Sequence, residues 1–343
     1  MNKTYFSKAY KDKNSAGNKA KTDIETILDN HGYMNLGKPQ SIITGKVKAY
    51  FYTLGSILKT LSSLKKGDVL LIQYPFKKYY EFICNMAHRK GAKVITLIHD
   101  LGSFRRKKLT PAMEMERLRH SDYIIVHNES MKKWLIEHKV DRPVDCLEIF
   151  DYLSENEAKN IDATDKFRVI YAGALNRRKN AFLYSMGDLI NNYELHIYGG
   201  GFEKEEAQAS SNLFYGGYKP SEEFIADAQG EFGLVWDGDS TETCCGAFGE
   251  YLKYNNPHKV SFYIRCNLPV IIWDQAGLAP FVEKEGIGIT ISSLKDMDKK
   301  LAELTKEDYL SMQENIRRIS NRLKSGYYTK AAVDKGVNYL NSI

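Results

Sequence analysis

The sequence predicts an α/β protein built from two doubly wound parallel sheets in tandem. Short β-branched apolar runs alternate with amphipathic helical stretches, which is typical of parallel strands joined by crossover helices. The strand-like runs are almost wholly apolar, as expected when helices cover both faces of a sheet. The chain has 343 residues, more than a single core usually accommodates, so two domains are expected.

In the first half, strands are predicted at residues 4–10, 68–75, 92–100, 122–128 and 144–150. Helices are predicted between them at 18–31, 46–64, 78–90, 110–119 and 129–138. A polar, charged segment at 153–166 then interrupts the pattern and is interpreted as a linker.

A second series of the same kind follows the linker. Its predicted strands are 167–173, 193–201, 212–218, 231–238, 268–274 and 286–292. Its predicted helices are 220–229, 247–254, 258–267, 279–285 and 295–323. The predicted domains are residues 1–155 and 156–320, followed by a C-terminal helix at 321–343. Because open α/β sheets bind ligands beyond the carboxyl ends of their strands, we expect a ligand cleft between the domains.

Composition narrows the kind of ligand and the compartment. The net charge of +6 suits an anionic ligand or an anionic membrane surface. The basic loop at 104–108 is read as a membrane-surface or anionic-acceptor loop, or as a solvated one. The five scattered cysteines indicate reduced thiols. With no predicted membrane span or signal peptide, a cytoplasmic protein is expected, with peripheral association at the inner membrane face as an extension.

The helix start in "YNNPHK" (254–259) is the main candidate binding element. Asn255 or Asn256 is predicted as the N-cap, and Pro257 as the first helical residue. Free amides at a helix N-terminus attract anions, while the helix dipole disfavours a cation such as Lys259 in the first turn. A bound diphosphate would compensate the positive charge of Lys259. The alternative is an ordinary capped helix with its lysine in solvent.

Three further strand ends in the second half carry candidate ligand contacts. A small-residue turn at 172–174 precedes Arg178 and Lys179, which suits a phosphate or simply a solvated basic loop. The glycines at 199–201 allow a close backbone approach, but they do not form the G-x-G-x-x-G dinucleotide fingerprint. Tyr218 is a candidate for stacking on a base, or for ordinary packing.

In the first half, the loop Ser15, Ala16 and Gly17 follows a predicted strand and is expected at the cleft. His99 and Asp100 end another predicted strand and form a candidate acid–base pair that deprotonates a hydroxyl. The structural alternative is a histidine that ends a strand and an aspartate that caps a turn.

The segments "VIYAGAL", "FGLVWDG" and "GEYLKYNNPHKVSFYI…LPVIIW" resemble two-domain GT-B glycosyltransferases, in particular the bacterial glucosyltransferase-3-like group. That group extends sugars on serine-rich adhesins and includes galactofuranosyltransferases of polysaccharide clusters. The resemblance covers nearly the whole chain by domain order, and its specific motifs lie in the second half. It implies two Rossmann-like domains and a C-terminal helix that packs on the first of them.

The resemblance implies metal-independent transfer of a hexose from a UDP-sugar, without a cofactor, to a glycan, glycoprotein or lipid-linked acceptor. Arg178 and Lys259 would hold the diphosphate, Lys179 would be a further donor contact, and Tyr218 would lie at the nucleotide. The remaining donor contacts implied are Ala16, Gly17, Tyr254, Asn255, Asn256, Pro257 and His258. Self-association is also implied, whereas nucleic acid is not an expected partner.

The sequence departs from the family pattern at the donor-sugar carboxylate. Many retaining GT-B enzymes have a glutamate seven positions before the proline of a G-x-P turn. Here Phe262 takes that position, and Asn267 replaces the glycine. Glu250 or Asp237 could substitute for the carboxylate. The departure keeps a second hypothesis open, a non-catalytic partner that binds a nucleotide sugar or glycan. An epimerase or other dinucleotide enzyme would need the glycine fingerprint, which "FSKAYKDKNSAG" lacks.

Overall fold

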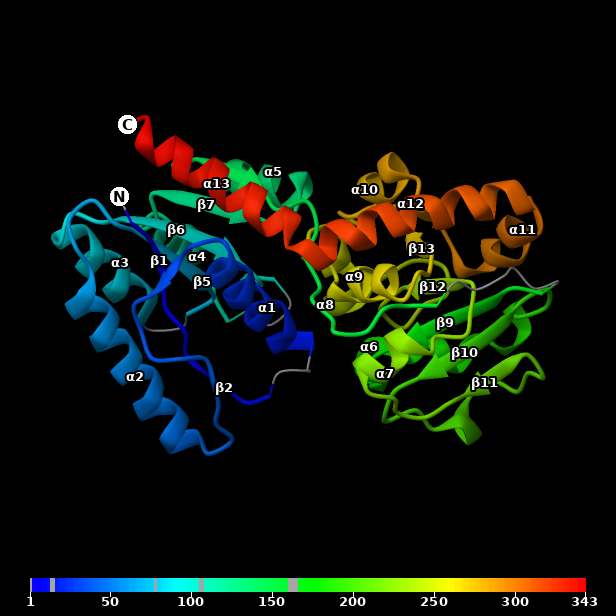
Figure 1. Ribbon diagram of the computed structural model, residues 1–343. Coiled ribbons are helices and arrows are strands. Elements are labelled where there is room, and N and C mark those ends of the chain that lie inside the picture. The colour runs from blue at the N-terminus through cyan, green and yellow to red at the C-terminus, as the bar shows by residue number, and fades with distance from the viewer. Residues whose placement is uncertain (1, 13–15, 77–78, 105–107, 160–165) are drawn as a thin grey trace. The chain divides into compact units, whose positions relative to one another are not determined.

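A computed structural model describes residues 2–12, 16–76, 79–104, 108–159 and 166–343 (Figure 1). The chain divides into two compact units. Unit 1 comprises Met1–Asp151 and Ser325–Ile343, and unit 2 comprises Tyr152–Lys324. For comparison, the sequence predicts boundaries after residues 155 and 320.

Unit 1 contains a six-stranded parallel sheet in the order β3-β1-β5-β6-β7-β8. The strands of unit 1, including β2 and β4 outside this sheet, are β1 (Lys3–Tyr5), β2 (Ala9–Tyr10), β3 (Met34–Asn35), β4 (Ser41–Ile42), β5 (Val69–Tyr74), β6 (Lys93–Ile98), β7 (Tyr123–Val126) and β8 (Val144–Cys146). Its helices are α1 (Ala16–Asn30), α2 (Lys46–Ser63), α3 (Tyr80–Arg89), α4 (Pro111–Leu118), α5 (Glu129–Glu137) and α13 (Tyr327–Asn341).

The first predicted strand, 4–10, is in fact two strands, so that prediction is wrong in detail. β1 joins the main sheet, whereas β2 pairs with β4 in a separate two-stranded sheet. β3 and β4 were not predicted, because each is two residues long and too short to show a period.

The C-terminal helix α13 packs on strands β6, β7 and β8 of unit 1. Gly336 allows this contact, since a Cβ there would lie 2.9 Å from the Tyr123 ring and 3.0 Å from Ile95. Lys3 pairs with Asp334 of the helix at 2.9 Å. The last residues of the chain therefore complete the first unit.

Unit 2 contains a second six-stranded parallel sheet, in the order β11-β10-β9-β12-β13-β14. Its strands are β9 (Arg168–Ala172), β10 (Glu194–Tyr198), β11 (Leu213–Tyr215), β12 (Phe232–Val235), β13 (Val270–Trp273) and β14 (Gly288–Ile291). Its helices are α6 (Arg177–Asn180), α7 (Ser221–Ala226), α8 (Gly246–Gly249), α9 (His258–Arg265), α10 (Ala279–Glu285), α11 (Met297–Ala302) and α12 (Lys306–Ser325). Short 3₁₀ segments are η2 (Ala181–Ser185), η3 (Gly187–Leu189), η4 (Lys204–Glu206), η5 (Glu250–Lys253) and η6 (Leu294–Asp296).

The helix predicted at 295–323 is divided into η6, α11 and α12. Thr305 interrupts it, because the Thr305 hydroxyl accepts a bond from the Asp308 amide at 3.1 Å. The Asp308 carboxylate in turn accepts from the Thr305 amide at 3.1 Å, so the pair forms a reciprocal cap at the start of α12. Helix α6 was not predicted, since four residues are too few for a periodic signal.

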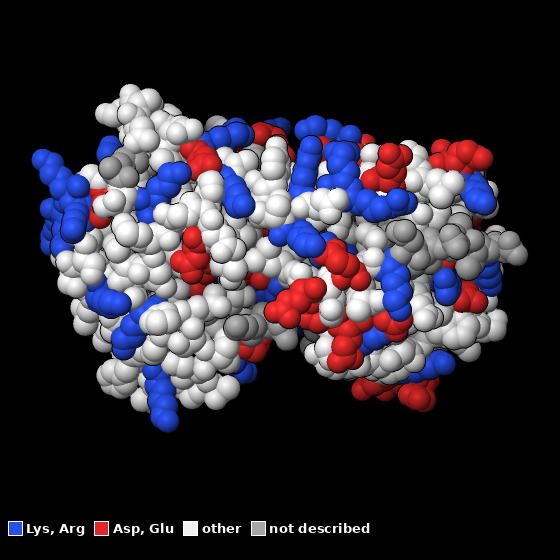
Figure 2. Space-filling view, viewed as in Figure 1, with Lys and Arg blue, Asp and Glu red and all other residues white. Residues whose placement is uncertain are grey.

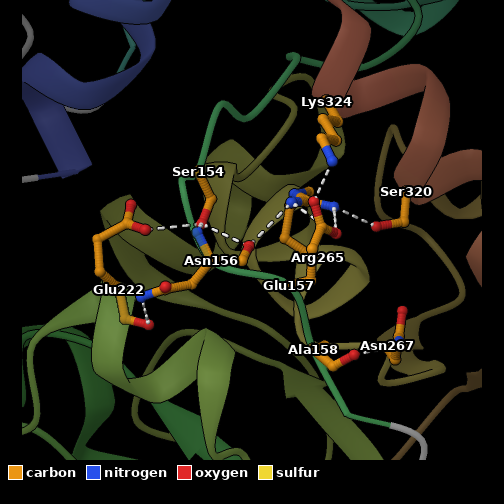
Figure 3. Close-up of polar contacts among 9 residues, drawn as sticks. All are labelled: Ser154, Asn156, Glu157, Ala158, Glu222, Arg265, Asn267, Ser320 and Lys324. Carbon is orange, nitrogen blue, oxygen red and sulfur yellow. Dashed lines mark hydrogen bonds and ion pairs between the residues drawn. The ribbon is translucent and has the colours of Figure 1, made fainter.

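The segment predicted as a linker is bonded to the rest of unit 2 as far as it is described (Figure 3). The Ser154 hydroxyl donates to Glu222 at 2.7 Å, and the buried Arg265 donates to the Asn156 carbonyl at 3.2 Å. Glu157 pairs with Arg265 at 3.4 Å and with Lys324. Residues 160–165 of the predicted linker lie outside the described residues.

Candidate functional site

The strand order of unit 2 places a ligand site at the carboxyl ends of β9 and β12. From β9 the chain continues through β10 to β11 on one side, and β12, β13 and β14 follow on the other. The reversal between β9 and β12 is the topological switch point, where open α/β sheets bind ligands.

Lys259 lies at this switch point rather than in open solvent. Its Nζ is 3.5 Å from the centroid of the Tyr171 ring, on β9. Tyr171 is buried. A cation on the face of an aromatic ring is attracted by the ring quadrupole, so this contact fixes the ammonium group at the end of the central strand.

The Tyr171 hydroxyl connects the lysine to a polar network. It accepts a bond from the Asn180 amide at 2.6 Å and lies 3.3 Å from Asp237 Oδ1, beyond the end of β12. Asp237 Oδ2 lies 3.3 Å from Nζ of Lys179. One carboxylate therefore faces two lysines, Lys179 and Lys259, at the switch point.

Burial and the nearby charge of Lys179 together lower the pKa of Lys259 to about 7, although the Asp237 carboxylate opposes the shift. A buried ammonium group whose charge is only partly compensated releases its proton readily. An anion bound here would restore the protonated form. The site is therefore electrostatically suited to a diphosphate.

Close packing of α9 on β12 sets the position of Lys259. Gly233 makes this possible, because a Cβ there would lie 2.3 Å from the Tyr263 ring. The Tyr263 hydroxyl then accepts a bond from the Ala172 amide at 2.8 Å, at the end of β9. At its other end, Arg265 bonds to the segment that enters unit 2 (Figure 3).

The predicted cap of this helix is wrong. α9 begins at His258 with Pro257 as its N-cap, and a proline has no side-chain acceptor for the first amides. Asn256 directly precedes Pro257, one position outside the cap, and it is buried. Tyr254 and Asn255 precede it and are half-buried. His258 stacks on Tyr152 with ring centroids 4.9 Å apart.

The other predicted contacts of unit 2 lie around the same strand ends. Arg178 is exposed on α6, with its guanidinium 5.5 Å from the Phe248 ring. The Gly199 amide donates to the Gly217 carbonyl at 2.8 Å, which brings the loop of Tyr218 beside the end of β10. Tyr218 is 74% exposed, so its ring is accessible for stacking.

The predicted site residues of unit 1 lie at the start of α1 and just after β6. Ala16 and Gly17 form the first turn of α1 rather than a loop, which corrects that prediction, and Ser15 lies outside the described residues. His99 and Asp100 follow β6, as predicted. In the basic loop 104–108, residues 105–107 lie outside the described residues.

Gln73 on β5 orients the His99 ring. The Gln73 amide nitrogen donates to the Lys21 carbonyl at 3.2 Å, so its oxygen faces Nε2 of His99 at 2.6 Å. A carbonyl oxygen only accepts, so Nε2 carries the proton. In the neutral ring Nδ1 is then the basic nitrogen. Phe150 stacks on the ring with centroids 5.3 Å apart.

Sequence reasoning missed Tyr171 and Asn180 and gave Asp237 only a substitute role. A tyrosine near the end of an otherwise apolar strand was the available signal. Phe262, which takes the position of the family glutamate, is half-buried and packs against Tyr152 and Phe224. Asn267 has a φ of 57°, the left-handed conformation that a glycine would adopt there.

All five cysteines are free thiols, as the composition predicts. Within the described residues, no group of three or more His, Cys, Asp or Glu side chains is arranged to hold a metal ion. None of the helices in the described part of the chain has the length and apolar character needed to cross a bilayer.

The sequence matches the N-terminal domain of the family "Glucosyltransferase 3-like" over residues 3–149 and its C-terminal domain over residues 169–336. It is 33% identical to the β-1,6-galactofuranosyltransferase WbbI of Escherichia coli over 330 residues, covering 95% of this chain and 96% of that protein. It is 26% identical to glucosyltransferase 3 of Streptococcus gordonii over 280 residues, 79% of each chain.

Two solved structures share the fold. A DNA-modifying β-glucosyltransferase, solved with and without uridine diphosphoglucose, has a TM-score of 0.51 at 14% identity and covers 97% of this chain and 100% of its own. T4 phage BGT in complex with UDP-glucose also has a TM-score of 0.51 at 14% identity, over 96% of this chain and 98% of its own.

Two parallel-sheet units with this strand order, together with these neighbours, show the two-domain GT-B fold. The family match and the sequence relatives place the chain among the glycosyltransferases with this fold. Within that class, the chain belongs to the glucosyltransferase 3-like family.

Proposed function

We propose that this glycosyltransferase moves a hexose from a UDP-sugar to a hydroxyl group of a saccharide acceptor. The observation that carries the proposal is the pair Lys179 and Lys259, which shares the Asp237 carboxylate at the switch point of unit 2. A diphosphate would supply the missing negative charge, and the first-turn amides of α9 would add donors to its oxygens. Arg178 would contact the same group from α6.

The relatives support the choice of donor. WbbI and glucosyltransferase 3 are named for the transfer of galactofuranose and glucose, which are both hexoses. The phage enzyme that shares the fold binds UDP-glucose. We infer that the uridine diphosphate lies across the ends of β9 and β12, with Tyr218 on the nucleotide side.

The chemistry assigned to the chain is a substitution at the anomeric carbon of the donor. The acceptor oxygen forms a bond to that carbon, and the bond from the carbon to the phosphate oxygen breaks with its electron pair leaving on UDP. Lys259 and the α9 terminus would stabilise this charge, which is usually the largest catalytic term. His99 Nδ1 would take the acceptor proton, with Asp100 beside it.

Because Lys179 and Lys259 supply the positive charge, the proposed transfer needs neither a metal ion nor a separate cofactor. The rate of transfer should therefore remain the same, within about twofold, when EDTA is added to the enzyme. Loss of activity in EDTA that Mg²⁺ or Mn²⁺ restores would contradict this part of the proposal.

A thermal-unfolding screen against nucleotides tests the donor site. A ligand that binds the folded state at 100 times its Kd stabilises that state by about 2.7 kcal/mol. We expect UDP to raise Tm in the parent and not in Lys259→Met, while NAD has no effect. A response to NAD without one to UDP would refute the donor assignment.

Hydrolysis of UDP-glucose and UDP-galactose by the pure protein separates a transferase from a non-catalytic binding partner. Slow release of UDP that Lys259→Met abolishes would support the enzyme. Tight binding of UDP without turnover, with or without acceptors, would support the binding partner instead.

A further inference from the structure

Helix α2 of unit 1 presents an apolar stripe to solvent. Val47, Phe51 and Leu58 are 69%, 62% and 56% exposed. Their spacing of four and seven residues places them on one side of the helix. Another side of the helix is buried through Ser56, Ile57, Thr60 and Leu61. The helix therefore carries a second apolar face beyond the one that packs on the core.

The same segment is basic near both ends of the helix. Between Gly45 and Gly67 the sequence contains lysines and no Asp or Glu. The exposed lysines of the segment are Lys46, Lys48, Lys59, Lys65 and Lys66. Figure 2 shows the region of α2, at the lower left as in Figure 1, as a largely white surface with blue side chains on it.

Neighbouring elements extend the apolar surface. Ile42, on β4 just before the helix, is exposed, and so is Phe82 on α3. The hydroxyls of Tyr50 and Tyr79 lie 2.8 Å apart and join α2 to the start of α3. Exposed apolar side chains therefore occur on elements next to α2 as well as on the helix itself.

We propose that this face of α2 docks on the surface of an anionic lipid bilayer. A helix with bulky apolar residues on one side and lysines beside them lies in the membrane interface, with its apolar side chains among the acyl chains. The lysines would contact anionic headgroups. A second copy of the chain is a poorer occupant, because it would bring the same lysines against one another.

The docking surface does not depend on the donor site. It does favour one acceptor class, lipid-linked saccharides, over soluble glycans and glycoproteins, and this last step rests on the proposed function. A bilayer that holds unit 1 would present such acceptors to the enzyme at high local concentration.

Vesicle sedimentation with the full chain tests the proposal. The parent should sediment with vesicles of equal parts phosphatidylglycerol and phosphatidylcholine, less at high salt, and only weakly with pure phosphatidylcholine. The double variant Phe51→Ser with Leu58→Ser should bind at least about tenfold more weakly. Lys46→Gln with Lys48→Gln should lose the preference for phosphatidylglycerol.

The matched control is Ile136→Ser with Leu310→Ser, at residues that are 56% and 48% exposed on α5 and α12. This control should bind vesicles like the parent, and so should Lys259→Met, whose defect lies in donor binding. Unfolding curves must show that all variants fold.

Two results would overturn the docking surface. The first is a parent that stays in the supernatant, or a Phe51 and Leu58 variant that binds as the parent does. The second is a dimer in sedimentation velocity that this variant abolishes while no vesicle binding is seen, since that result assigns the face to a second copy of the chain.

Discussion

The switch points of the two units have the same topology and opposite electrostatics. In unit 2 the ends of β9 and β12 gather Lys179 and Lys259 around Asp237. In unit 1 the switch point lies between β1 and β5. There Glu25 accepts bonds from Ser7 at 2.7 Å and from Tyr10.

At both sites, burial favours the neutral form of the ionisable side chain. It lowers the pKa of Lys259 and raises the pKa of Glu25, whose Tyr10, Gln40 and Ser7 bonds oppose the shift. In unit 1 the Glu25 carboxylate is bonded by neutral groups, whereas in unit 2 the Asp237 carboxylate is shared by two lysines. The contrast agrees with the proposed division, in which unit 2 binds the charged donor and unit 1 handles neutral hydroxyl groups.

The largest expected effect comes from the proposed base in unit 1. His99→Ala should lower kcat by about 100- to 10,000-fold, the usual contribution of general base catalysis. UDP binding should not change, because donor contacts are assigned to unit 2. Steady-state kinetics and calorimetry measure the two quantities. The control is His120→Ala, at a half-buried histidine bonded to Asn85 at 2.8 Å. Equal loss in both variants would remove His99 from the mechanism.

In unit 2, Lys259→Met should lower kcat/KM by about 100- to 1,000-fold, since it removes the charge that stabilises the leaving group. Lys299→Met, at an exposed lysine of α11, is the matched control. Binding of UDP-glucose should be weakened in the first variant alone. Full activity of Lys259→Met would show that the contrast between the two switch points has no functional meaning.

The pH dependence of donor binding sharpens the same contrast. Lys259 of the free protein loses its proton above about pH 7, and a bound diphosphate should raise its pKa. Binding therefore takes up a proton above pH 7, and affinity for UDP-glucose should fall by up to about 15-fold between pH 7 and 8.5. Well below pH 7, Lys259 is protonated in both the free and the donor-bound protein, so the affinity should no longer change with pH.

Isothermal titration in two buffers of different ionisation enthalpy measures this proton uptake directly. Lys259→Met should show none. An affinity that rises with pH, or the same proton uptake in the variant, would mean that another group titrates.

A smaller effect is expected at Gln73. In Gln73→Glu a carboxylate replaces the neutral acceptor beside His99 and should raise the pKa of the imidazole. The acidic limb of the pH–rate profile should then move to higher pH by about one unit. At a fixed pH on that limb, the rate should be about tenfold lower. An unchanged profile with a lower rate would indicate a purely structural role for Gln73.

The smallest effect concerns the segment that enters unit 2. Glu157 and Lys324 are both about half exposed, so their coupling should be below about 1 kcal/mol. A double-mutant cycle with Glu157→Gln and Lys324→Met, measured by urea unfolding, gives this value. A coupling of several kcal/mol would mean that the pair is buried from water in solution.

Much of the fold could be predicted, because long apolar strands and amphipathic helices carry periodic signals. The position of Lys259 at a helix start was also predictable from Pro257 and the residues around it. Its contact with Tyr171 was not, because β9, the end of β12 and α9 meet only in the folded sheet. The cap was mispredicted for a related reason, since Asn256 is buried by tertiary contacts.

A crystal structure of the protein soaked with UDP tests the donor site most directly. We expect the diphosphate at the ends of β9 and β12, with an oxygen about 3 Å from Nζ of Lys259 and others near the first amides of α9. A nucleotide bound elsewhere, with Lys259 still packed on Tyr171 alone, would contradict it.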